Sequence, residues 1–185
     1  PPLHWDESNN IKWKVEIPGS GSATPIVWKD HIFVLTAVDT GVEPASEEES
    51  RKNQIDADRS SRPEGEDSRS RRFGRRMTRQ ISTFHEFVIL CLDKETGKVL
   101  WQQVANREVP HEGGHLTNTY ASASPTTDGR NLYVSFGSRG IYCYTLDGSL
   151  LWQRDLGDME TRRGFGEGAS PVIHGNRLIV NWDHE

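Results

Sequence analysis

The chain has 185 residues, a length that suits one domain of ordinary size and is short for two. Charged residues make up 26% of the sequence and the formal net charge is −5, a mildly acidic balance that argues against a nucleic-acid-binding protein. No apolar run approaches the roughly 20 residues of a membrane-spanning helix, which excludes a chain that crosses the bilayer in that form.

The first predicted elements, in chain order, are short strands. Residues 11–13 look like the end of a strand. Residues 23–34 begin with Ala, a small hydroxylic residue and Pro, followed by a short run, a polar turn and an apolar strand. A proline is tolerated at the start of a strand because no ladder N–H is needed there. Residues 23–34 therefore predict a hairpin.

Residues 41–80 interrupt this pattern with a polar, strongly charged segment. Its large apolar side chains are limited to Val42, Ile55, Phe73 and Met77. So little apolar surface cannot offset the entropy of ordering the segment, and we expect residues 41–80 to be a disordered insertion. Its last part, residues 68–80, contains six arginines and no acid. One interpretation makes these arginines an arm that binds an anionic partner. The composition favours the other, a solvated loop in which the acidic and the basic half partly neutralise each other.

After the insertion the hairpins repeat. Residues 87–101 and 141–152 each read as strand, turn and strand. Residues 123–134 and 169–180 repeat the pattern of residues 23–34. Each repeating unit is thus two hairpins, which means four antiparallel strands.

The spacing of these hairpins indicates the fold class. Pro125 and Pro171 open equivalent hairpins 46 residues apart, and Trp101 and Trp152 end equivalent hairpins 51 residues apart. A four-stranded unit that recurs every 45–50 residues or so is typical of β-propeller blades. The sequence therefore predicts an all-β partial propeller domain over residues 1–185, with about three four-stranded antiparallel blades once the insertion is set aside.

Three blades are too few for a closed ring, because propellers close with about four to eight. An open arc would expose an unpaired blade face. We therefore expect either a fragment of a longer protein or a chain that needs missing blades or a second copy to close.

Residues 91–101 read Cys-Leu-Asp-Lys-Glu-Thr-Gly-Lys-Val-Leu-Trp. They resemble the tryptophan-docking motif of the pyrroloquinoline-quinone-type (PQQ-like) β-propeller repeats, Ala-x-Asp-x-x-Thr-Gly-x-x-x-Trp, with Cys91 in place of the alanine. The copy that ends at Trp152 is one residue shorter and lacks the threonine.

Physical chemistry explains why such a motif would join blades. Asp93 and Thr96 can bond the backbone of the turn, and Gly97 can adopt a positive φ. Trp101 and Trp152 each offer a large flat surface for the gap between neighbouring blades. These five residues are the predicted structural docking residues.

The resemblance places the chain among the quinoprotein-like propeller proteins, which include the outer-membrane assembly lipoprotein of the barrel-assembly complex. It implies a periplasmic or cell-surface location in bacteria. The function that we favour is a non-catalytic platform for a protein or glycan ligand, with enzymatic activity left open.

A second hypothesis makes these blades part of a PQQ-dependent quinoprotein dehydrogenase. The resemblance implies that such an enzyme holds PQQ with a calcium ion and carries adjacent cysteines. The two cysteines of this chain, Cys91 and Cys143, are far apart in the sequence. No cofactor is therefore predicted outside that alternative.

A third hypothesis is a metal-dependent enzyme. Residues 111–115 read His-Glu-Gly-Gly-His, the letters of the zinc-protease motif. That motif needs a helix, which two glycines and Pro110 disfavour. A loop site that combines His111 and His115 with His184 from the next blade is the remaining metal prediction. The composition favours the simpler alternative of hydrogen-bonded histidines in a polar loop.

The last candidate site is one mouth of the central channel. Residues 164–168 occupy the same repeat position as residues 118–122, where the chain enters an inner strand. Propellers build binding sites at such positions, which makes Tyr120 and Glu167 the predicted polar groups of the channel mouth. Alternatively, the glycines of residues 164–168 only let backbones crowd near the axis.

Overall fold

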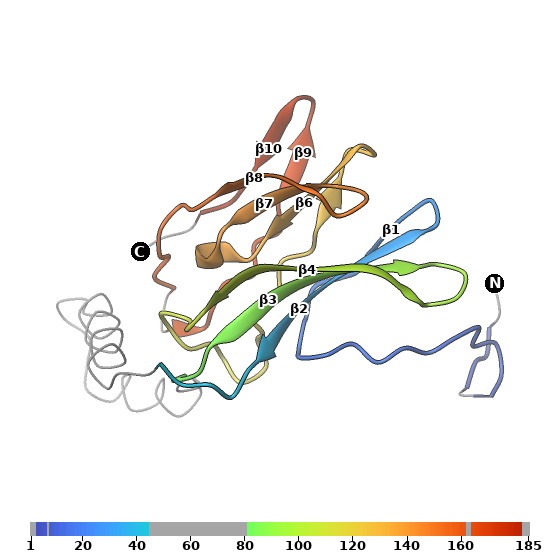
Figure 1. Ribbon diagram of the computed structural model, residues 1–185, viewed down its shortest axis with the longest axis horizontal. Coiled ribbons are helices and arrows are strands. Elements are labelled where there is room, and N and C mark those ends of the chain that lie inside the picture. The colour runs from blue at the N-terminus through green and yellow to red at the C-terminus, as the bar shows by residue number, and fades with distance from the viewer. Residues whose placement is uncertain (1–2, 7, 45–80, 162–163, 183–185) are drawn as a thin grey trace.

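The structure is a computed structural model, shown in Figure 1, that describes residues 3–6, 8–44, 81–161 and 164–182. Residues 45–80, most of the predicted insertion, and His184 lie outside these ranges. The expectation of disorder over residues 41–80 therefore stays a prediction.

Three antiparallel sheets make up the described part of the chain. The first has the order β1-β2-β3-β4 and the second β5-β6-β7-β8, while β9 and β10 form a separate hairpin. The first sheet consists of β1 (Ile26–Trp28), β2 (His31–Asp39), β3 (His85–Asp93) and β4 (Val99–Glu108). The others consist of β5 (Thr126–Thr127), β6 (Asn131–Ser135), β7 (Ile141–Thr145), β8 (Leu150–Arg154), β9 (Val172–His174) and β10 (Arg177–Ile179).

The prediction of an all-β partial β-propeller is confirmed. Each four-stranded sheet follows the chain order from one strand to its neighbour, as a propeller blade does. Figure 1 shows the second sheet beside the first and the β9–β10 hairpin beyond both, in an arc that does not close. A short 3-10 helix, η1 (Gly137–Arg139), lies between β6 and β7. No helix among them is long and apolar enough to cross a membrane.

The core lies between the first and second sheets. Alternate residues of β3, namely Phe87, Ile89 and Cys91, are buried in one cluster with side chains of β6 and β7. The intervening residues Val88, Leu90 and Leu92 are buried on the opposite face, where Val15 and Ile17 of the N-terminal segment cover them. Both faces of β3 are thus buried, which explains its continuous apolar run.

Tryptophans connect one sheet to the turn of the next. The indole Nε1 of Trp101, on β4, donates to the carbonyl oxygen of Leu146 at 3.0 Å. Trp13 makes the same contact one sheet earlier, because its Nε1 donates to the Lys94 oxygen at 2.9 Å. Residues 11–13 form no strand, but Trp13 marks the junction that a preceding blade would make. Trp152 instead packs against Tyr133 of its own sheet, with ring centroids 6.2 Å apart.

The turn that receives Trp13 is built by the motif residues. The Asp93 carboxylate accepts hydrogen bonds from the backbone N–H and the hydroxyl of Thr96, both at 2.7 Å. These bonds hold the pKa of Asp93 below its usual range. Gly97 has a φ of +72° and lies under the indole ring of Trp13, where a side chain would collide with the ring.

Candidate functional site

A pocket lies beside the ends of β6 and β10, next to the connector that follows β4. Its walls come from the β4–β5 connector, the turn around η1, the β8–β9 connector and the segment after β10. Its space open to water is about 40 Å³, which fits about three water molecules or the tip of one side chain. The charged and aromatic lining residues are Glu112, Tyr120, Phe136, Arg139, Glu167 and Trp182.

Arg139, at the end of η1, is the buried hub beside this pocket. Its guanidinium is paired at Nε with Glu108 at 3.0 Å and at Nη1 with Asp158 at 3.4 Å. The third nitrogen, Nη2, lies 2.6 Å from Nδ1 of His111. Only 5% of the residue is exposed, so its charge depends on these partners. Arg139 therefore links the end of β4 to both connectors.

His111 is held as a neutral ring. An arginine can only donate, so Nδ1 of His111 accepts from Arg139. The other ring nitrogen, Nε2, then carries the proton and donates to the Met159 carbonyl oxygen at 2.9 Å. Burial and the positive charge of Arg139 lower the pKa of His111. Both ring nitrogens are thus engaged with protein groups.

Glu167 caps the η1 turn. Its carboxylate accepts hydrogen bonds from the Ser138 backbone N–H at 2.6 Å and from the Ser138 hydroxyl at 2.5 Å. The same hydroxyl oxygen accepts from the Met159 N–H at 2.7 Å. Gly137 has a φ of +61°, and a Cβ at this position would overlap the Glu167 carboxylate. A glycine is therefore required for the carboxylate to reach the turn.

Glu112 is the second carboxyl group of the pocket. Its Oε1 accepts a hydrogen bond from the Thr161 hydroxyl at 2.6 Å. Burial is the main cause that raises the pKa of Glu112 to about 7; hydrogen bonds from Thr161 oppose it, and the negative charge of Glu167 adds a smaller increase. The Tyr120 hydroxyl donates to the Glu112 backbone oxygen at 3.2 Å, which ties the predicted channel-mouth tyrosine to this residue.

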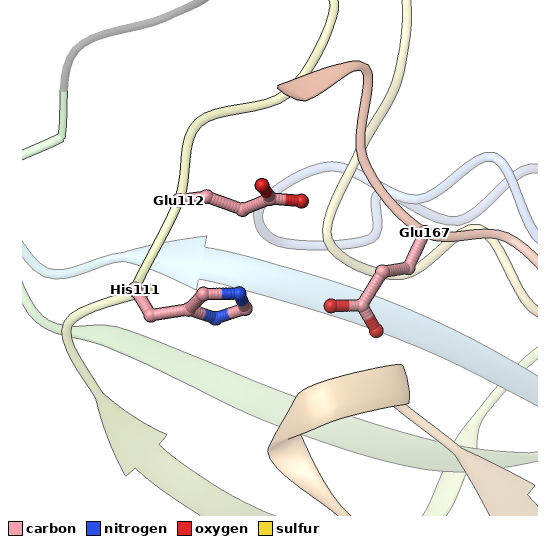
Figure 2. A group of neighbouring side chains, drawn as sticks. All are labelled: His111, Glu112 and Glu167. Carbon is pink, nitrogen blue, oxygen red and sulfur yellow. The ribbon is translucent and has the colours of Figure 1, made fainter. Parts of the chain in front are cut away.

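Figure 2 shows the side chains of His111, Glu112 and Glu167 converging from two connectors. One potential ligand atom of each lies within 4.8 Å of the others, and this set could hold a metal ion. His115 is not a member of it. Its Nδ1 lies 2.8 Å from the Thr117 hydroxyl, and its ring packs edge-on against Phe165. With His184 outside the described ranges, the three-histidine metal site stays a prediction.

Both predicted channel-mouth residues, Tyr120 and Glu167, line the pocket. The two cysteines, by contrast, lie apart from it, and each is buried in a different sheet. Burial raises the pKa of both the Cys91 and the Cys143 thiol to about 11. The quinone-dependent alternative stays a prediction.

Comparison with protein families finds a family that matches more than half of the chain. The family described as outer membrane protein assembly factor BamB, built of PQQ-like repeats, matches residues 85–184, which are 100 of the 185 residues. The chain belongs to this family. A comparison with curated proteins finds no match. The BamB-family segment runs from the first residue of β3 through β10 and contains all of the charged residues that line the pocket.

Sequence reasoning missed the residues that hold this pocket together. Arg139, Ser138, Asp158 and Thr161 come from a short turn and a connector with no repeated motif. One local signal was available. Glu112 lies inside the His-Glu-Gly-Gly-His segment, residues 111–115, whose histidines were predicted as metal ligands. In the structure, the residue of this motif that lines the pocket with a charged side chain is Glu112.

Proposed function

We propose that this chain is a non-catalytic β-propeller platform that binds a partner protein in the bacterial envelope through the pocket described above. Membership of the BamB family supports the envelope location, because the family is described by an outer membrane assembly factor. It also supports a protein as the ligand in preference to a glycan.

The observation that carries the proposal is the engagement of the pocket's reactive groups within the structure. The Ser138 hydroxyl is committed to Glu167 and to the Met159 N–H. The Thr161 hydroxyl is committed to Glu112. Each of these two hydroxyls donates to a carboxylate, and the Glu167 carboxylate also accepts from the Ser138 backbone N–H. These hydrogen bonds stabilise the conformation of the connectors and the turn that form the pocket.

A rigid concave surface made by connectors is suited to recognition. Because Arg139 ties β4 to both connectors, a ligand would meet walls that need little further ordering. Binding sites on propellers and other scaffolds are commonly built from such loops on a rigid frame.

Photocrosslinking in the native cells tests the proposal. p-Benzoylphenylalanine would replace Phe165, which is 38% exposed and adjoins the pocket residue Gly166. The matched control site is Leu100, which is 50% exposed near the start of β4. Eight residues of strand separate it from the pocket end of β4, a distance of about 26 Å. We expect a discrete protein adduct from position 165 and none from position 100.

A blocking variant ties the adduct to the pocket itself. Gly168→Leu would add a side chain to the pocket wall, and a Cβ there would meet only Ser122 Cβ, at an ordinary 3.7 Å. We expect this variant to reduce the adduct about tenfold, the effect of about 1.4 kcal/mol in binding. An adduct that resists protease but yields to glycan hydrolysis would overturn the proposal in favour of a glycan ligand. Equal adducts from both sites would also overturn it.

A further inference from the structure

Two acidic side chains, Glu112 and Glu167, line the pocket. Among the described residues, the side-chain hydrogen bonds to the Glu112 and Glu167 carboxylates come from neutral donors, Thr161 and Ser138. No salt bridge of the described residues includes either carboxylate.

Arg139 also lines the pocket, but its charge is already balanced. Its guanidinium pairs with Glu108 and Asp158, neither of which lines the pocket, and its remaining terminal nitrogen donates to His111. An incoming cation would therefore meet the Glu167 carboxylate, the Glu112 carboxyl group, whose pKa is raised to about 7, and an arginine whose charge is already paired.

The spacing of the two carboxylates suits a compact cation. Oxygen atoms of Glu112 and Glu167 lie within 4.8 Å of each other. An ammonium nitrogen donates to a carboxylate at about 2.8 Å, so a single ammonium group can reach both side chains at once.

The remaining walls favour an organic cation over a hydrated one. Tyr120, Phe136 and Trp182 place three aromatic side chains in the lining, together with the apolar Met159 and Val180. Aromatic faces attract cations, and apolar walls accommodate the methylene stem of a long side chain.

We propose that this pocket takes the ammonium group of a lysine side chain presented by the partner protein. The inference deepens the proposed platform function and rests on it. An ammonium group is a compact charge that can reach both carboxyl groups from one nitrogen, whereas a guanidinium is a wider planar fork. A divalent cation fits less well, because the only histidine of the group, His111, uses both ring nitrogens and adjoins Arg139.

Calorimetry on the purified chain tests the ligand chemistry directly. The probe is Nα-acetyl-lysine-N-methylamide, and its control is the norleucine analogue, which keeps the methylene stem and lacks the ammonium group. We expect the lysine compound to bind in a 1:1 ratio and the norleucine compound to bind at least about tenfold more weakly. Equal binding of the two compounds would overturn the proposal.

Matched variants locate the binding. Glu112→Gln keeps an acceptor for Thr161 and removes the charge, and we expect it to weaken lysine-probe binding about tenfold. Asp155→Asn removes an exposed charge from the β8–β9 connector, which also carries Glu167, and should leave binding within about twofold. If Glu112→Gln does not fold, Gly168→Leu makes the same test by filling the pocket. Full binding by whichever of these two variants is folded would overturn the proposal.

Calcium chloride serves as the competing probe. The lysine proposal expects calcium to leave lysine-probe binding unchanged at equal ionic strength. Stoichiometric calcium binding that displaces the lysine probe would overturn it in favour of a metal site.

The two proposals fail in different ways. If the lysine probe binds no better than the norleucine control while the adduct from position 165 persists, the lysine proposal is rejected and the platform function stands. Absence of the adduct with lysine binding intact would remove the platform function and leave a cation-binding pocket.

Discussion

The indole ring of Trp101 lies directly over Gly148, in the turn of the neighbouring sheet. A Cβ added at Gly148 would come within 2.8 Å of Trp101 Cδ2. The glycine has a φ of +91°, so the turn conformation and the contact both favour the absence of a side chain. With the hydrogen bond from Trp101 Nε1 to Leu146, this contact joins the first blade to the second.

Replacing this tryptophan should loosen the junction between blades. We expect Trp101→Ala to lower the free energy of unfolding by about 3–5 kcal/mol, because a large cavity opens between the sheets. The control is Leu100→Ala, at a half-exposed position on the same strand, which should change stability by about 0.5 kcal/mol or less. Denaturant titration measures both. A similar small effect in the two variants would contradict the docking role of Trp101.

Gly137 should be intolerant of any side chain because of Glu167. Gly137→Ala would place an alanine at a positive φ, and its Cβ would displace the Glu167 carboxylate from the Ser138 N–H. We expect the free energy of unfolding to fall by about 2–4 kcal/mol. Gly157→Ala, at a φ of +83° with no atom near its Cβ, tests the backbone strain alone and should cost about 1 kcal/mol. Thermal unfolding compares the two, and equal losses would show that the carboxylate contact contributes nothing.

Arg139 should not be replaceable by lysine. A single ammonium group cannot span Glu108, Asp158 and His111 as the buried guanidinium does, so Arg139→Lys leaves part of this network unpaired. We expect a loss of about 2–4 kcal/mol by denaturant titration. Arg130→Lys, at an exposed position, should stay within about 0.5 kcal/mol of the parent chain. Full stability of Arg139→Lys would contradict the role of Arg139 as the hub.

Glu112 should make stability fall as the pH rises. Its carboxyl group titrates near the ordinary value of 4.5 when unfolded and about 7 when folded, so the folded chain binds the proton more tightly between these values. We expect up to about 2 kcal/mol of stability to be lost between pH 4.5 and pH 7, after allowance for partial exposure. Glu112→Gln should abolish this loss.

His111 acts in the opposite direction and provides an internal control. Its folded pKa is lowered, so its contribution to stability is lost as the pH falls below 6.5 through that lowered pKa. The Glu112→Gln chain should keep this decline on the acid side. Urea unfolding at pH steps from 4 to 8 separates the two groups. A Glu112→Gln chain with the parent's loss of stability towards pH 7 would contradict the assignment.

The blade pattern was predictable because strand pairing follows a local rule. The repeat of Ala, a hydroxylic residue and Pro before each inner hairpin, and the turn of Asp93, Thr96 and Gly97, encode short strands and tight turns through neighbouring residues. Their period then indicates four-stranded blades without any long-range information. The same repeat alignment predicted Tyr120 and Glu167 at a channel mouth, and in the structure both line the pocket.

The partners of the pocket residues were not predictable in the same way. His111 lies 28 positions from Arg139 in the sequence, and Glu167 lies 29 positions from Ser138. No periodic pattern relates these positions, because each lies in a connector or turn outside the repeated strands.

Sequence alone therefore determined the strands, their turns and the propeller family, since these depend on residue types that recur at fixed short spacings. Tertiary structure alone decided the chemistry of the site. Packing the second sheet against the first buries Arg139, neutralises His111 and raises the pKa of Glu112. Burial and the distances between charges set each of these properties, and both arise only when distant connectors meet.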